Sequence, residues 1–174
     1  MVNYTAKSGK KDMEYNELMQ RFAGKFGIDS LAIEDGASAL EIDGMTVGFI
    51  HDETEDVVMV VAEIGYPPPD ADGPFGSAML KANYLFGGTD GATLCQNPDT
   101  GAYAVMRTWP LAAHDDDTFA AAVEGLMNTA ERWREVLDGI REAEEAAEMA
   151  ELEDDGQDEG DVPGEISLGG FMQV

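Results

Sequence analysis

The residues best suited to metal chemistry lie around His51, one of two histidines in the 174-residue chain. Asp52, Glu53 and Asp56 follow it, and carboxylates beside an imidazole are common ligands for divalent metals. These four residues lie at the edge of an expected turn, however, and their spacing fixes no coordination geometry. A polar turn is therefore the favoured interpretation, and we expect neither a metal site nor a cofactor.

The second histidine and the single cysteine give no stronger sign of catalysis. His114 precedes Asp115, Asp116 and Asp117, whose carboxylates are well suited to cap and stabilise the start of a helix. Cys95 lies within an expected apolar strand, whereas a reactive thiol needs an exposed, electropositive setting. We therefore expect Cys95 to be a small buried side chain, and we expect no enzymatic activity.

The net charge of −26 narrows the range of partners. The chain has 10 Lys and Arg residues against 36 Asp and Glu residues. Binding nucleic acid needs clustered basic residues, and an anionic membrane surface would repel this chain. The acidity suits a basic or amphipathic protein partner, or else it serves solubility alone. With no signal peptide and no long apolar run, the chain is expected in the cytoplasm.

The spacing of apolar residues predicts three helices and two groups of strands. Helices are expected over 12–26 and 75–86 and from the acidic run at 115–117 to Ile140. Strands are expected at 31–34, 39–43, 45–51, 57–64, 92–96 and 102–109. Asp43-Gly44 is a strong hairpin signal. The order of helix, strands, helix, two strands and helix indicates an α+β fold with an antiparallel twisted sheet.

Composition divides the chain into three parts. Residues 1–11 are expected to be a flexible N-terminal extension, and 12–150 a single folded domain. Residues 151–174 are expected to be an acidic, disordered tail, since twelve acidic residues and one basic residue lie in 141–174. The closing segment 166–174 is apolar again, and charge does not explain it.

The strand expected at 57–64 is apolar at nearly every position. An antiparallel strand with one wet face should alternate, so something must cover each face of this one. The second helix is also rich in apolar side chains. Both features predict a homodimer in which one face of these elements meets a second subunit.

Several segments resemble one family in order and spacing. Residues 82–94 (Ala-Asn-Tyr-Leu-Phe-Gly-Gly-Thr-Asp-Gly-Ala-Thr-Leu) are similar to the "AN…G…GATL" segment of Tir-chaperone (CesT-like) proteins, the class I type III secretion chaperones. The turn 97–101, the strand end 109–111 and the helix segment 130–134 resemble later parts of that family, and 40–44 its first hairpin. The resemblance covers about residues 12–140, although Ile28-Asp29-Ser30-Leu31 replaces the usual proline.

The resemblance implies a non-enzymatic homodimer that binds the N-terminal chaperone-binding segment of a secreted effector and keeps it soluble and export-competent. Strand addition and helix-in-groove docking would hold that segment. Components of the secretion apparatus are further expected partners. By resemblance, the dimer seam is expected at Met79, Leu80, Asn83, Tyr84, Tyr103, Val105 and Arg107. Two alternatives stay open: a regulatory or scaffolding module of the same fold without an export substrate, and an unrecognised hydrolase or metal enzyme.

The effector is expected to bind the first helix together with the outward face of the first strands. The candidate residues are Leu18, Phe22, Phe26, Leu31, Ile33, Leu40, Ile42, Val47 and Phe49. The same residues could instead form the core between helix and sheet, and for Phe22, Leu40 and Ile42 that interpretation is at least equally good.

Overall fold

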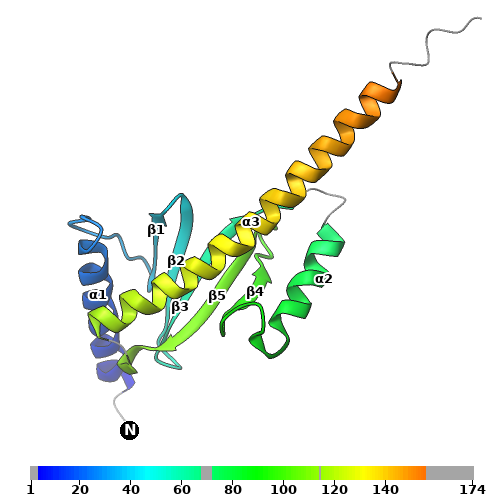
Figure 1. Ribbon diagram of the computed structural model, residues 1–174. Helices are drawn as coiled ribbons and strands as arrows, with labels where there is room; N and C mark the ends of the chain where they lie inside the picture. The colour runs from blue at the N-terminus through cyan, green and yellow to red at the C-terminus, as the bar shows by residue number, and fades with distance from the viewer. Residues whose placement is uncertain (1–3, 68–71, 114, 156–174) are drawn as a thin grey trace, which may run out of the picture. The chain divides into compact units, whose positions relative to one another are not determined.

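The computed structural model describes residues 4–67, 72–113 and 115–155. The elements run in the order predicted from the sequence, and the α+β class is confirmed (Figure 1). They are α1 (Tyr4–Gly24), β1 (Ala37–Ile42), β2 (Met45–Asp52), β3 (Val57–Gly65), α2 (Asp72–Asn83), the 3-10 helix η2 (Tyr84–Phe86), β4 (Thr93–Gln96), β5 (Tyr103–Pro110), the 3-10 helix η3 (Leu111–Ala113) and α3 (Asp116–Asp155). The chain forms two compact units, Met1–Arg141 and Glu142–Val174, so α3 contributes to both.

The strands form one five-stranded antiparallel sheet in the order β1-β2-β3-β5-β4. The β1–β2 turn is the expected one, because Asp43 and Gly44 have φ values of 51° and 70°. Two consecutive positive φ values define the tight hairpin turn that matches the twist of the flanking strands. The turn places Leu40 opposite Val47, and this register fixes which side chains share each face of the sheet.

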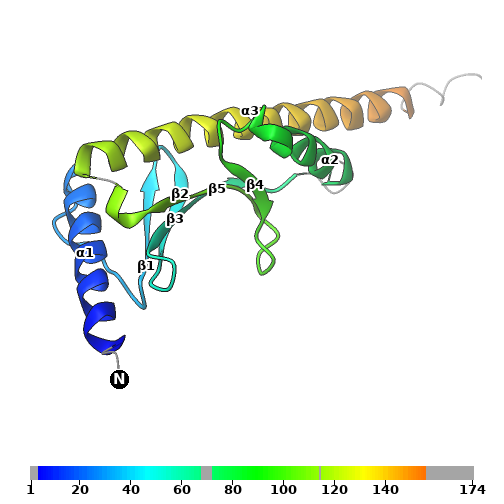
Figure 2. The same ribbon diagram turned by 90° about the horizontal axis from the view of Figure 1, so that it is seen from below.

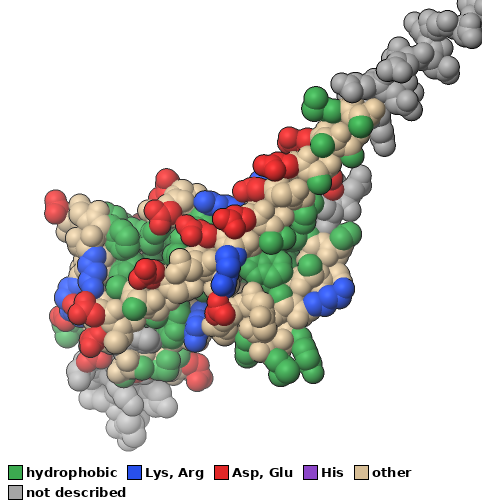
Figure 3. Space-filling view, in the orientation of Figure 1, with side chains coloured by type: hydrophobic (Ala, Val, Ile, Leu, Met, Phe, Trp, Pro, Cys, Tyr) green, Lys and Arg blue, Asp and Glu red, His purple; other side chains and the backbone are tan. Residues whose placement is uncertain are grey.

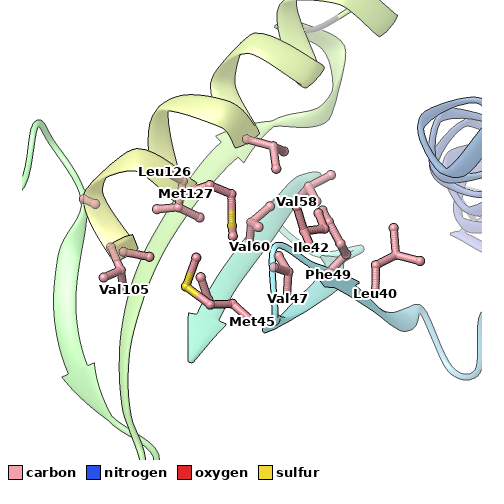
Figure 4. Packing of buried hydrophobic residues seen from close by; sticks show 14 of the residues in the cluster. Leu40, Ile42, Met45, Val47, Phe49, Val58, Val60, Val105, Leu126 and Met127 are labelled. Atoms are coloured by element: carbon pink, nitrogen blue, oxygen red, sulfur yellow. The ribbon is translucent and has the colours of Figure 1, made fainter. Parts of the chain in front are cut away.

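One face of the sheet, here called the inner face, carries the core. Burial alternates along β2 and β3, as expected for strands with one covered face. Figure 4 shows the inner-face side chains packed against Leu126 and Met127 of α3. These strand residues are Leu40, Ile42, Met45, Val47, Phe49, Val58, Val60 and Val105, all of them buried.

Helix α1 contributes an apolar stripe with helical spacing. Tyr15, Leu18, Met19 and Phe22 are all buried, and they recur at intervals of three and four residues. The ring of Phe22 packs 5.3 Å from that of Phe119 on α3 and 5.4 Å from that of Phe49 on β2. This aromatic cluster joins both helices to the sheet.

The predicted strand at 31–34 is wrong, since only an isolated bridge joins Glu34 to Ala37. The backbone of Leu31 is paired with a side chain instead of another strand. Gln20 Nε2 donates to Leu31 O at 2.8 Å, and Gln20 Oε1 accepts from Leu31 N at 3.0 Å. The amide thus supplies both hydrogen bonds that a neighbouring strand would have made.

The helix boundaries also differ from the sequence prediction. Helix α1 begins at Tyr4 instead of near residue 12, and it ends at Gly24. Gly27 has a φ of 76°, which suits a glycine just past a helix end. Helix α3 continues to Asp155, well beyond the end of its apolar stripe. Of the predicted tail 151–174, residues 151–155 are the last turn of α3, and residues 156–174 lie outside the described residues.

Within the second unit, the described side chains of residues 142–150 are exposed or half-buried. The helix there is mostly acidic and alanine-rich, which is consistent with a solvated helical segment. Across the described ranges, no helix is both long and apolar enough to span a bilayer.

Candidate protein-binding surfaces

The polar residues around His51 form a turn beside the core. The His51 ring is buried on the inner sheet face and stacks on the Tyr15 ring, with centroids 4.9 Å apart. Its Nε2 atom lies 3.8 Å from Asp56 Oδ1. Asp52 Oδ1 accepts a hydrogen bond from the Thr54 N–H, which closes the turn. Among the described residues, no three His, Cys, Asp or Glu side chains are grouped to hold a metal ion.

The acidic run before α3 caps the helix, as predicted. Asp115 Oδ1 accepts a hydrogen bond from the Thr118 N–H at 2.9 Å, and Thr118 Oγ1 accepts one from the Asp115 N–H at 2.9 Å. This reciprocal pair satisfies two backbone donors at the helix start. His114 lies outside the described residues.

A groove of 370 Å³ lies between the C-terminal end of α1 and the first turns of α3. We call it the α1–α3 groove. Its apolar lining comes from Phe22, Phe26, Ile42, Val123 and Met127, and its charged lining from Lys25, Asp43, Glu124 and Glu131. In the space-filling view, hydrophobic side chains are open to solvent between these two helices (Figure 3).

Phe26 is the most accessible aromatic side chain of this groove. It is 51% exposed, and its ring meets the ring of Phe22 edge-on at 5.2 Å. Lys25 beside it is held by Asp117 at 2.9 Å. The groove therefore offers an aromatic anchor on an apolar floor, with three carboxylates and one paired lysine around it.

The nine sequence-predicted effector residues do not share one surface. Phe26 is exposed and Ile33 is half-buried. The placement of the strand residues on an outward face is wrong, because they point inward against α1 and α3. The seven buried members are Leu18, Phe22, Leu31, Leu40, Ile42, Val47 and Phe49. Of the nine, the groove brings together Phe22, Phe26 and Ile42.

A second surface gathers at the C-terminal end of α2. We call it the η2 patch; it consists of Leu80, Tyr84, Leu85 and Phe86, which are 74%, 76%, 80% and 53% exposed. Figure 3 shows hydrophobic side chains at the end of α2 where η2 lies. A contiguous exposed apolar patch of this kind is typical of an interaction surface.

The backbone of the η2 patch is held in a conformation that these residues rarely adopt. Leu85 and Phe86 have φ values of 52° and 56°. The left-handed conformation costs a non-glycine residue roughly 1–2 kcal/mol. The segment that follows the turn is held by α3, because Trp133 Nε1 donates to Gly88 O at 3.0 Å and Arg132 pairs with Asp90. The fold thus holds two large apolar side chains outward at a cost.

The predicted dimer seam divides between this patch and the core. Leu80, Tyr84 and Arg107 are exposed, whereas Met79, Tyr103 and Val105 are buried inside the subunit. The sequence prediction omitted Leu85 and Phe86. Their signal was the run Tyr84-Leu85-Phe86 before Gly87-Gly88, which holds more apolar residues than one helix face can bury.

A third surface lies on the outer face of the sheet, opposite α1 and α3. Here a groove of 460 Å³, the outer-face groove, is lined by Ile50, Val61, Cys95, Ala104 and Met106 among others. Cys95 is half-buried in it, so the expected strand is confirmed but full burial of the thiol is not. Burial raises the pKa of this thiol and keeps it protonated near neutral pH.

Comparison with known proteins matches residues 17–134 to the model of the Tir chaperone protein (CesT) family. The match covers more than half of the chain. The chain belongs to this family. The Tir chaperone match extends from within α1 to the middle of α3. It therefore includes all five strands and residues of all three surfaces. The resemblance found in the sequence is confirmed.

Solved structures with a similar fold include three complexes, two of which are named as complexes of a chaperone. "Structure of the HopA1-SchA Chaperone-Effector Complex" aligns with a TM-score of 0.58 at 18% identity, over 71% of this chain and 95% of that chain. "Crystal Structure of the ExsC-ExsE Complex" aligns with a TM-score of 0.58 at 19% identity, over 70% of this chain and 92% of that chain. The Yersinia pestis type III secretion chaperone SycH, bound to a fragment of YscM2, aligns with a TM-score of 0.52 at 15% identity. This alignment covers 68% of this chain and 98% of that chain. A search of curated proteins finds no match.

Proposed function

We propose that this Tir chaperone family member is a type III secretion chaperone of the bacterial cytoplasm. It binds the N-terminal segment of an effector and keeps that segment soluble and competent for export. The family match over 17–134 carries the proposal. The exposed apolar surfaces support it, because a globular domain does not need them for its own stability.

The α1–α3 groove is the proposed contact for the effector. Phe26 and the floor beneath it offer apolar surface to one or two large side chains of an extended or helical segment. The three carboxylates Asp43, Glu124 and Glu131 favour basic residues beside those anchors. A disordered segment can present both the apolar anchors and the basic residues beside them. Such a segment becomes ordered when it binds and is unfolded again when it is released.

The η2 patch is the proposed seam of a homodimer. Two copies of the patch related by a two-fold axis would cover Leu80, Tyr84 and Leu85, which otherwise stay in water. Arg107 of β5 contacts the segment that follows the patch, because its Nη1 donates to Asp90 O at 3.0 Å. The strained turn is then explained by the partner surface that it builds.

Co-purification from the native cell, followed by mass spectrometry, would identify the effector. Its N-terminal fragment is then titrated against the full chain and against Phe26→Ala. We expect the substitution to weaken binding about tenfold or more, equivalent to at least 1.4 kcal/mol. Met13→Ala is the matched control, since Met13 is an exposed apolar residue of the same helix outside the groove. Equal affinities for all three proteins would exclude the groove.

A further inference from the structure

The outer face of the sheet has an unusual centre. Gly48 lies in the middle of β2, and its φ is not in the left-handed region, so the backbone there does not require glycine. A Cβ at this position would meet only Val61 O, at 3.9 Å. Glycine inside a strand weakens the strand and often marks a place where another chain approaches closely. The space above Gly48 is therefore a hollow on the sheet surface. Packing inside this subunit does not require it, because a side chain at this position would fit.

Apolar side chains surround this hollow. The register places Ala39 and Val61 beside Gly48 in one cross-strand row, and Val61 beside Met106 in the next pair. Ile50 on the same strand is 42% exposed. In the two perpendicular ribbon views, α1 and the first turns of α3 lie on the opposite face of the sheet (Figures 1 and 2). The outer-face groove is thus an apolar sheet surface that no described helix covers.

The charges of this face have one sign. The outward-pointing residues of the described strands include three charged side chains, Glu41, Asp52 and Glu63, and none of these outward residues is Lys or Arg. A second copy that docked with the same face would bring these carboxylates against its own, which is unfavourable. A segment with basic residues on either side of an apolar stripe would be attracted.

We infer that the outer-face groove docks an amphipathic helix of the exported partner, with its apolar stripe over Gly48 and Lys or Arg residues toward Glu41 and Glu63. This inference rests on the proposed export-chaperone function and adds a second contact to the α1–α3 groove. A sheet buries each apolar face against another layer, and the inner face already uses helices in this way. A helix of about 18 residues is ~27 Å long and crosses the roughly 19 Å width of five strands.

The first test uses two synthetic peptides of about 18 residues with the same apolar helical stripe, one with Lys flanks and one with Glu flanks. They are titrated against the full chain, and alkylation of Cys95 is followed with and without peptide. Cys95 is the only cysteine and lines the groove, so it reports occupancy without any substitution. We expect the Lys peptide to bind and to slow alkylation. Equal binding of the Glu peptide, unchanged alkylation, or no binding of the Lys peptide at about 1 mM would overturn the inference.

The second test fills the hollow from inside the protein. Gly48→Val should weaken the Lys peptide about tenfold or more while the melting temperature stays equal or rises, because valine suits a strand better than glycine. Gly48→Ala gives a smaller change of the same kind. The matched control is Thr108→Ile, which adds bulk on the same face outside the groove lining. Affinity that survives Gly48→Val overturns the inference.

Two further outcomes separate this inference from the function on which it rests. If the effector fragment is weakened by Phe26→Ala but not by Gly48→Val, the export function stands and the outer-face site is wrong. If Gly48→Val converts a dimer into a monomer, the occupant is a second copy and the inference is also wrong. If no effector fragment binds the wild-type chain, the proposed function itself fails.

Discussion

Asn83 and Leu94 are joined by two hydrogen bonds across the junction of α2 with the sheet. Asn83 Nδ2 donates to Leu94 O at 3.0 Å, and Asn83 Oδ1 accepts from Leu94 N at 2.9 Å. The side chain of one residue therefore replaces a missing strand at the free edge of β4. It also fixes where α2 ends, and with it the position of η2.

Replacing Asn83 should test this clamp. Asn83→Ala leaves both backbone groups of Leu94 without their partner, and we expect a loss of about 1–3 kcal/mol in the free energy of unfolding. Chemical denaturation would measure it. Asn16→Ala is the control, since Asn16 is exposed on α1 and should change the unfolding free energy by less than about 0.5 kcal/mol. Equal losses of unfolding free energy in the two variants would show that the two hydrogen bonds of Asn83 do not stabilise the fold.

The η2 patch predicts the oligomeric state. The wild-type chain should have twice its subunit mass of 18.7 kDa in light scattering. Leu80→Glu places a charge in the seam and should give a monomer with an unchanged melting temperature, because Leu80 is 74% exposed within the subunit. Leu85→Glu should act in the same way.

The control for the seam is Val136→Glu, which replaces an exposed apolar residue outside the η2 patch. A wild-type mass of one subunit at micromolar concentration would contradict the homodimer. So would a dimer that survives both substitutions in the patch.

Substitution of a core aromatic residue should destabilise the protein much more than substitution of a surface aromatic residue. Phe49 is fully buried, and Phe49→Ala should cost about 3–5 kcal/mol of unfolding free energy. Phe26→Ala should cost about 1 kcal/mol or less, because half of its side chain is already in solvent. Denaturant titration of the two variants tests the distinction. Similar losses would mean that Phe26 belongs to the core and is not an anchor for a ligand.

Tyr15 should make stability depend on alkaline pH. Its hydroxyl donates to Phe49 O at 3.1 Å, and burial raises the pKa of the phenol, an effect that a hydrogen bond with Ser38 opposes in part. Because the folded pKa lies above the unfolded value of about 10, Tyr15 contributes stability that is fully present below pH 10. That contribution is lost as the pH rises through the folded pKa.

Tyr15→Phe keeps the ring but removes the ionising group. We expect it to cost about 1 kcal/mol at neutral pH and to make the loss of stability above pH 10 less steep than in the wild type. Tyr66→Phe is the control, because Tyr66 is exposed. Identical alkaline profiles for Tyr15→Phe and the wild type would refute the assignment.

The acidic segment should be dispensable for folding. Nothing after about residue 141 offers a sustained apolar stripe, and ordering each residue costs roughly 1–2 kcal/mol of backbone entropy. A chain ending at Glu151 should therefore melt at the same temperature as the full chain. A drop of several degrees on calorimetry would show that the removed residues pack against the domain.

The order of elements was predictable because the hydrophobic period changes clearly between helices and strands, and because turn residues such as Asp43-Gly44 separate the strands. Which side chains of each strand lie on the inner face of the sheet was not predictable. Val57–Gly65 is apolar on both faces, so alternation could not tell the inner face from the outer, and the register to β2 and β5 decides it. Leu31 was misassigned because no local pattern shows that Gln20 supplies its hydrogen bonds.

The candidate site was predictable in chemistry but less so in position. An apolar set around the first helix and the first hairpin could be read from the sequence, and Phe26 is indeed exposed. Whether Phe22 or Phe49 faces solvent depends on Phe119 of α3, which packs against them from about 70 to 100 residues further along the chain. The hollow at Gly48 was invisible in the sequence, because glycine in a strand has several explanations.

The proposed function depends most on one interaction, that of this chain with the N-terminal segment of its effector. The direct measurement compares three ligands by titration against the full chain: the complete effector, its isolated N-terminal segment, and the effector without that segment. We expect the isolated segment to bind as tightly as the complete effector, and the truncated effector not to bind. Full affinity of the truncated effector, or no affinity of the isolated segment, would contradict the proposed function.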